Sequence, residues 1–192
     1  MRIRQRRRYA AGRGFTLVEL LVVVAMVGIL AALGLVGYRK YMAAAGTGEP
    51  KAIMQAIRGA QESYKAEMLV YLDCSGTLDD WYPSADLGDH KHSWNAVHHD
   101  ADEWRMLNVA TDGAVKFGYA VVAGVGTGFP TNTGTTYTWA GLPAPPLSDP
   151  QFAPNGPWYV IQAAGDRDQD GTLALLLTTS TMSGIYWEND TE

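Results

Sequence analysis

Three aspartates near the end of the chain have the spacing of cation ligands. Asp166, Asp168 and Asp170 alternate with other residues, and Gly171 follows them directly. In calcium loops, alternate carboxylates converge on one hard cation, and a glycine in the next position permits the sharp turn. The backbone carbonyl of Thr172 would be a further ligand. The sequence therefore predicts a Ca²⁺ site at Asp166, Asp168, Asp170 and Thr172.

The predicted calcium loop differs from an EF-hand. Its twelfth position, where an EF-hand has a bidentate glutamate, is Leu177, and residues 173–178 have the pattern of a strand. Ligands that complete the shell could come from the carboxy-terminal residues Glu188, Asn189, Asp190 and Glu192. The alternative is a solvated acidic turn between two strands, in which three carboxylates so close together would repel one another.

Another acidic residue, Glu19, lies near the start of the chain and is the one charge in the apolar run from Phe15 to Gly37. As a helix this run is about 34 Å long at about 1.5 Å per residue, which is enough to cross a hydrocarbon core of about 30 Å. A carboxylate inside a membrane-spanning segment is costly and usually marks a partner or a site. We therefore expect Glu19 to pair with a cation.

The central part of the chain holds four histidines among acidic residues, and these are His90, His92, His98 and His99. Such a group invites a metal-binding interpretation. However, the His-x-His and His-His pairs lack the fixed companions of a zinc motif, and histidines beside acids are common on protein surfaces. The sequence therefore does not predict a specific transition-metal site here.

The residues around Glu19 resemble a known family. The string from Gly14 to Glu19, GFTLVE, is similar to the class III signal of type IV pilins and of the pseudopilins of type II secretion. The resemblance implies that a prepilin peptidase cuts between Gly14 and Phe15 and that the new amino-terminal phenylalanine is methylated. It also implies that Glu19, the fifth residue of the mature chain, pairs with the Phe15 amine of a neighbouring subunit during assembly.

Residues 1–14 form a basic leader, which holds six of the fifteen Lys and Arg residues. Because basic residues next to a span hold that end in the cytoplasm, we expect a single-pass protein of the bacterial inner membrane with a cytoplasmic N-terminus. A secretory signal peptide fits less well, since its apolar segment is only about 7 to 15 residues long. Without the leader, nine basic residues remain against twenty acidic ones, so no nucleic-acid partner is indicated.

Behind the predicted transmembrane and assembly helix of residues 15–37, the pattern predicts an α+β fold. Residues 38–71 read as an amphipathic continuation of the helix, which Gly46 and Gly48 could divide. Residues 72–192 would be a globular head, with an irregular surface loop at 72–112 and a mostly antiparallel sheet at 113–192. The strands expected within the sheet are 114–124, 135–140, 158–164, 172–178 and 185–188. The family resemblance implies the same pilin fold, a long helix packed on a sheet.

No Ser/His/Asp or Cys/His arrangement, phosphate loop or redox pair is evident, so we do not expect an enzyme. The single cysteine, Cys74, excludes an intrachain disulfide and is expected to be buried. The leading hypothesis is a major or minor pilin that leaves the inner membrane and joins copies of itself and other pilins in a periplasmic or extracellular filament. The alternatives are a pseudopilin of a type II secretion system and a non-polymerising, single-span binding protein.

Overall fold

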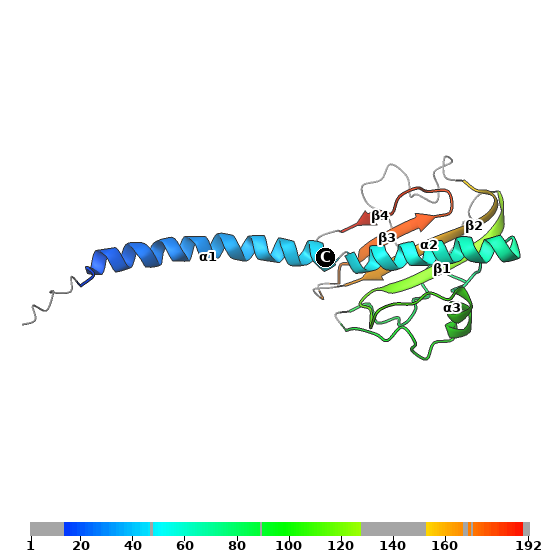
Figure 1. The fold of residues 1–192 in the computed structure, drawn as a ribbon, viewed down its shortest axis with the longest axis horizontal. Coiled ribbons are helices and arrows are strands. Elements are labelled where there is room, and N and C mark those ends of the chain that lie inside the picture. Colours follow the sequence, from blue (N-terminus) through cyan, green and yellow to red (C-terminus); the bar gives the residue numbers. More distant parts are fainter. Residues whose placement is uncertain are drawn as a thin grey trace, which may run out of the picture. The chain divides into compact units, whose positions relative to one another are not determined.

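The computed structural model describes residues 14–46, 48–88, 90–127, 153–166, 169 and 171–189. The chain divides into two compact units, Met1–Tyr41 and Met42–Glu192. We call them the stem unit and the head unit and describe each by itself. The ribbon in Figure 1 shows the elements of both.

The stem unit contains most of helix α1, which spans Leu17–Gly46. Its part Leu17–Tyr38 is long and apolar enough to cross a membrane, and none of it is buried. The predicted N-terminal apolar helix is therefore confirmed. A second helix, α2, spans Gly48–Met68, and residue 47 lies outside the described residues. Pro50 lies in the first turn of α2, where the missing amide hydrogen of a proline is tolerated.

Helix α2 is amphipathic, as predicted, and buries one face in the head unit. The buried residues of this face are Pro50, Ile53, Met54, Ile57 and Gln61. The prediction that the helix extends to Tyr71 is wrong, because Leu69 takes a left-handed conformation with a φ of 64° and ends the helix there. Tyr71 is nevertheless buried.

Four strands form one sheet in the order β1-β2-β3-β4, and every neighbouring pair is antiparallel. The strands are β1 (Gly118–Thr127), β2 (Asn155–Gly165), β3 (Ala174–Thr179) and β4 (Tyr186–Glu188). The α+β fold with an antiparallel sheet is confirmed. The strand predicted at 135–140 lies outside the described residues. The first strand begins four residues later than predicted, since Val115 forms only an isolated bridge with His92.

Alternate residues of the strands face two separate hydrophobic layers. Tyr119 and Val121 of β1 belong to the layer covered by α2, whereas Ala120 and Val122 point to the opposite face. The period of two along a strand produces this division. On the side of α2, Ile57 packs in the same cluster as Tyr119 and Val121. The sheet is therefore buried on both faces, and α2 covers one of them (Figure 1).

The segment 72–112, which we predicted to be an irregular surface loop, is not confined to the surface. It contains helix α3 (Ala101–Leu107) and contributes buried aromatic side chains to the core. The ring of Tyr82 stacks on Trp104 with centroids 4.8 Å apart, and Trp94 packs edge-on against both. The hydroxyl of Tyr82 donates a hydrogen bond to the carbonyl of Trp94. Because these aromatic residues are single and widely spaced in a polar sequence, no helical or strand periodicity reveals them.

Candidate functional site

The start of α1 is closed by reciprocal hydrogen bonds between Thr16 and Glu19. The amide and the hydroxyl of Thr16 donate to Oε2 of Glu19 at 2.9 and 2.8 Å. The amide of Glu19 donates to Oγ1 of Thr16 at 3.2 Å. This is a capping box, in which the N-cap hydroxyl and the carboxylate three residues later satisfy amides at the helix start. The Thr-x-x-Glu spacing is a sequence signal of this motif, and our sequence analysis missed it.

Gly14 and Phe15 lie just outside the helix, since α1 begins at Leu17. Phe15 is 83% exposed, and no atom would contact a side chain placed at Gly14 within 4 Å. The peptide bond between the two residues is therefore non-helical and open to solvent. A protease that binds its substrate as an extended chain can reach this bond without unwinding the helix.

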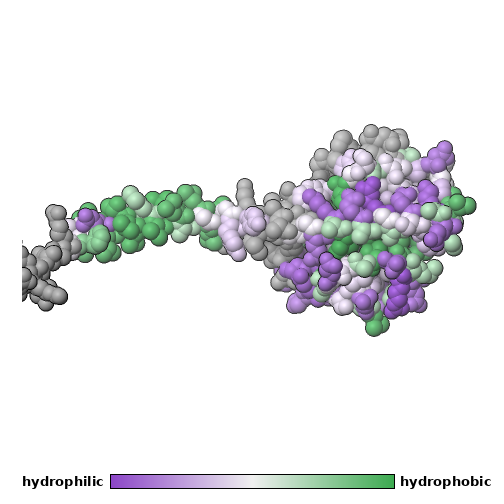
Figure 2. All heavy atoms as spheres, in the orientation of Figure 1, coloured by the Kyte–Doolittle hydropathy of each residue, from purple (hydrophilic) through white to green (hydrophobic). Residues whose placement is uncertain are grey.

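Helix α1 exposes apolar side chains all round. Its large hydrophobic residues from Leu17 to Val36 are between 42% and 89% exposed. Figure 2 shows the hydrophobic colour over most of the described part of this helix. A helix that is apolar on every side needs lipid or other helices around it. Glu19 is the one acidic residue of this surface, because the rest of the span from Leu20 to Tyr38 has no charge.

The acidic loop is described only in part, because Asp168 and Asp170 lie outside the described residues. The carboxylate of Asp166 accepts hydrogen bonds from the amides of Gln169 at 2.7 Å and Gly171 at 3.0 Å. Gly171 has a φ of 88°, a conformation that favours glycine. The loop therefore turns tightly around Asp166. This turn fits the first position of the predicted calcium loop, because each carboxylate oxygen keeps a lone pair for a cation.

Two of the carboxy-terminal residues proposed as further cation ligands, Glu188 and Asn189, lie beside the strand that leaves the acidic loop. Glu188 pairs with Leu175 in the ladder between β4 and β3. The side-chain amide of Asn189 donates to the carbonyl of Leu173 at 2.9 Å, two residues beyond Gly171. Asp190 and Glu192 lie outside the described residues. The structure thus brings the described end of the chain beside the strand that leaves the loop, and the Ca²⁺ site itself stays a prediction.

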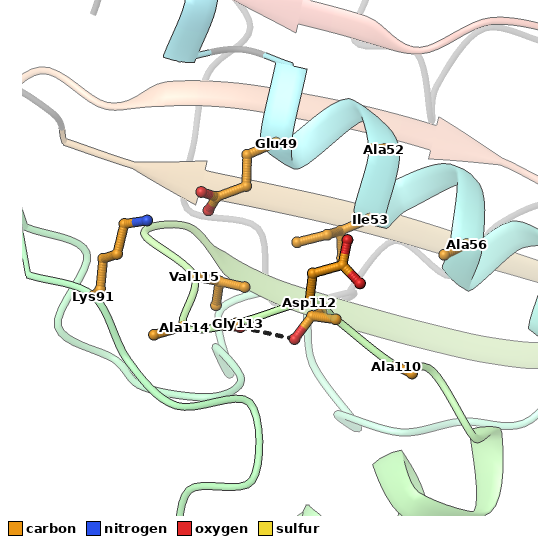
Figure 3. Close-up of a pocket in the computed structure, with 11 residues that line it drawn as sticks. Glu49, Ala52, Ile53, Ala56, Lys91, Ala110, Asp112, Gly113, Ala114 and Val115 are labelled. Carbon is orange, nitrogen blue, oxygen red and sulfur yellow. Dashed lines mark hydrogen bonds between the residues drawn. The ribbon is translucent and has the colours of Figure 1, made fainter.

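The head unit also has a pocket of about 460 Å³ beside the N-terminal half of α2. In Figure 3 the side chains of Glu49 of α2 and Lys91, which both line this pocket, point toward one another. Oε1 of Glu49 accepts a hydrogen bond from the amide of Lys116 at 2.7 Å, and the hydroxyl of Thr111 donates to the carbonyl of Gly113 at 2.9 Å. The apolar part of the lining consists of Ala52, Ile53, Ala56, Ala110, Ala114 and Val115. None of the described residues that line it is a histidine, cysteine or serine.

Two of the four histidines meet an aspartate that the sequence analysis did not consider. His98 and His99 both lie beside Asp80, whereas His92 is 3.7 Å from Asp86. Asp80 and His98 are 18 positions apart in the sequence, so no local spacing signals this contact. The structure therefore forms a histidine and aspartate cluster that the sequence pattern did not predict.

Comparison with known proteins supports the interpretation of the N-terminal segment. The family model described as the prokaryotic N-terminal methylation motif matches residues 11–35, a range that includes Gly14, Phe15 and Glu19. The type IV major pilin protein PilA of Myxococcus xanthus is 39% identical over 66 residues. This alignment covers 34% of the present chain and 30% of PilA, and no solved structure matches the chain. Similarity is therefore concentrated in about a third of each protein.

Proposed function

Because the chain is a type IV pilin-like protein with a prepilin-type signal, we propose that it is a structural subunit, major or minor, of a type IV pilus. The arrangement at the start of α1 carries the proposal. The helix is apolar on all sides, and its only acidic residue, Glu19, lies in the first turn. The solvent-accessible bond between Gly14 and Phe15 lies just before this turn. A membrane anchor needs only the apolar surface, whereas a filament subunit also needs the acid and the new amine.

Processing creates the partner for Glu19. Cleavage by a prepilin peptidase between Gly14 and Phe15 would remove the basic leader and leave a positively charged amine on Phe15. The capping bonds from Thr16 go to Oε2 of Glu19, and among the described residues no hydrogen bond to Oε1 is recorded. Oε1 can therefore accept a bond from the amine of a neighbouring subunit while the helix stays capped.

Assembly then follows from the different environments of the membrane and the filament. In lipid, the apolar side chains of α1 are already shielded from water, so close packing and polar contacts between helices drive association. An unpaired carboxylate inside the hydrocarbon region costs about 2.5–3.5 kcal/mol or more. Pairing Glu19 with a Phe15 amine removes this cost, and the attraction between the two charges is stronger where the dielectric constant is low.

The acidic loop is similar to the calcium-stabilised loop of major pseudopilins, which makes a pseudopilin of a type II secretion system a second candidate. We propose that Asp166, Asp168, Asp170 and the carbonyl of Thr172 bind one Ca²⁺ ion. The tight turn around Asp166 supports the proposal, as does the proximity of Asn189 to Leu173. If Glu188, Asn189, Asp190 or Glu192 completes the shell, bound calcium would attach the carboxy-terminal end to the sheet, in a chain whose single cysteine cannot form an intrachain disulfide. A pilus remains our first choice, because the relative found by comparison is named a pilin.

Mass spectrometry of the native protein and of purified surface filaments tests the proposal. We expect a chain that begins at methylated Phe15 and is present in the filaments. Gly14→Ala should block cleavage, whereas Gly12→Ala, a matched change in the same leader, should be processed normally. A chain that keeps Met1 and is absent from filaments would overturn the proposal in favour of a membrane-anchored binding protein. A processed chain that occurs only with secretion components would favour the pseudopilin.

A further inference from the structure

Two segments of the head unit bring two imidazoles and two carboxylates together. Asp80 directly precedes the buried Trp81, while His98, His99 and Asp100 directly precede α3, of which Asp100 is the N-cap residue. Nε2 of His99 is 2.6 Å from Oδ2 of Asp80, and Nε2 of His98 is 3.8 Å from Oδ1 of the same carboxylate. One donor atom from each of Asp80, His98 and His99 lies within 4.8 Å of the others.

These distances are close to those of a tetrahedral metal site. With metal–ligand bonds of about 2.0–2.1 Å, the ligand atoms of a tetrahedral Zn²⁺ ion are about 3.3 Å apart. The two distances from Asp80, 2.6 Å to His99 and 3.8 Å to His98, lie on either side of this value. The rings of His98 and His99 stack in the metal-free structure, whereas a metal ion lies in the plane of each imidazole that binds it. The exposed ring of His99 must therefore turn out of this stack to place the three donor atoms around one ion.

The charges in the cluster also suit a cation. Asp80 and Asp100 are close enough to interact, and burial together with the charge of Asp80 raises the pKa of Asp100. The ion pairs that the structure records for these two carboxylates are all with His98 and His99. A divalent cation bound between the imidazoles and Asp80 would offset the repulsion between the carboxylates.

Asp100 is placed to orient the ring of His98. In the metal-free structure the amide of Asp100 donates to Nδ1 of His98 at 3.3 Å, so the neutral ring carries its proton on Nε2. Metal binding at Nε2 moves this proton to Nδ1, which then needs an acceptor. Oδ2 of Asp100 is 3.9 Å from Nδ1. This oxygen is buried and has no hydrogen-bond partner among the described residues, so it is available as that acceptor.

The ring of His98 is also held by its neighbours. It packs edge-on against Tyr82 with centroids 5.5 Å apart and stacks on His99 at 4.2 Å. The side chain of His98 is only 12% exposed, whereas that of His99 is 66% exposed. The core therefore holds the ring of His98 in place, whereas the exposed ring of His99 is free to rotate toward a bound ion.

We propose that Asp80, His98 and His99 bind one divalent transition-metal ion of the Zn²⁺ class and that Asp100 orients His98. Imidazole nitrogens favour Zn²⁺ over the hard cations Ca²⁺ and Mg²⁺, which prefer oxygen ligands. A water molecule completes the four ligands on the exposed side of His99. The bound ion links residue 80 to the start of α3 and stabilises the folded head unit, because the unfolded chain does not hold these ligands together.

The alternative is a cluster that is complete without metal. The hydrogen bond to Asp80 is the main reason that the pKa of His99 is raised, and a protonated His99 would itself provide positive charge beside the two aspartates. In that case the imidazolium of His99 provides the positive charge in place of a metal ion, and Zn²⁺ does not displace its proton.

Isothermal titration calorimetry, in which Zn²⁺ is added to the metal-free, full-length chain in detergent, distinguishes the metal site from a cluster that is complete without metal. We expect one ion per chain, whereas Ca²⁺ should not compete for this site. His99→Ala and Asp80→Asn should each weaken binding by more than about tenfold. His90→Ala is the matched control, because His90 is an exposed histidine of the same segment that lies outside the cluster. Circular dichroism checks that each variant is folded, which we expect for the exposed His99.

Substitution of Co²⁺ for Zn²⁺ provides a second readout. Intense visible absorption bands that disappear in His99→Ala would support a four-coordinate site of this composition. The proposal is overturned if the chain binds no stoichiometric Zn²⁺, or if His99→Ala and Asp80→Asn bind as tightly as the unchanged chain. It is also overturned if His90→Ala weakens binding as much as His99→Ala does.

Discussion

The amide and the hydroxyl of Thr16 both donate to a single oxygen of Glu19, Oε2, at 2.9 and 2.8 Å. Glu19 therefore has a role within its own chain, because it closes the first turn of α1. The same carboxylate has a second oxygen, Oε1, which under the proposed function would accept a bond from the amine of another subunit. Capping within the chain and pairing between chains can occur together, and suitable substitutions can separate them.

Glu19→Ala removes both the cap and the charge, and we expect it to abolish incorporation into filaments while membrane insertion continues. Glu19→Gln keeps an oxygen that can accept the bonds from Thr16 but removes the charge, so we expect the same loss. Immunoblots of sheared filaments and of membrane fractions measure the two effects. Glu67→Ala, at an exposed position of α2, is the control and should assemble normally. Normal assembly of Glu19→Gln would show that capping, and not charge pairing, is what the filament requires.

Trp104→Ala should destabilise the head unit strongly. Trp104 is almost fully buried and stacks on Tyr82 with centroids 4.8 Å apart. Removing a buried aromatic side chain costs about 3–5 kcal/mol of unfolding free energy, which urea unfolding of the detergent-solubilised chain can measure. Met106→Ala is a matched control on the same short helix, and because Met106 is exposed, its effect should stay within about 0.5 kcal/mol. Equal effects of the two substitutions would contradict the buried position of Trp104.

Calcium should raise the melting temperature of the chain, because a ligand that binds only the folded state stabilises it. At a Ca²⁺ concentration about 100 times Kd, the gain is about 2.7 kcal/mol. Asp168→Ala or Asp170→Ala should remove this gain, whereas Asp112→Ala, at an exposed acidic position elsewhere in the head unit, should keep it. Differential scanning fluorimetry with Ca²⁺ and with a chelator provides the measurement. Identical melting temperatures under both conditions would exclude the calcium loop.

Cys74 should be inert toward thiol reagents in the native protein. Its side chain is 2% exposed, and burial is the main cause that raises the pKa of its thiol. A raised pKa lowers the fraction of reactive thiolate at any given pH. We expect a chromogenic disulfide reagent at pH 8 to modify one thiol per chain only after unfolding. In a Ser63→Cys variant, the added thiol on the exposed side of α2 should react at once. Rapid modification of native Cys74 would show that the segment around it opens readily.

The sequence by itself determined the features that depend on neighbouring residues. The processing motif from Gly14 to Glu19 is contiguous, and the apolar length of α1 follows from composition alone. The strands of the head unit were largely recognisable, since a period of two marks a strand whatever its partners are. Even the capping box was visible as Thr16 followed three residues later by Glu19, although we did not recognise it.

Only the tertiary structure decided which distant residues meet. The stacking of Tyr82 on Trp104 and the contact of Asp80 with His98 and His99 join positions about twenty residues apart. The path of the chain between these positions sets such contacts, and no local periodicity encodes that path. The end of α2 at Met68 is another example, because Leu69 leaves the helix although the apolar spacing continues to Tyr71. Tyr71 packs against Tyr159 of β2, with ring centroids 4.7 Å apart. Its apolar character therefore reflects packing on the sheet and not a longer helix.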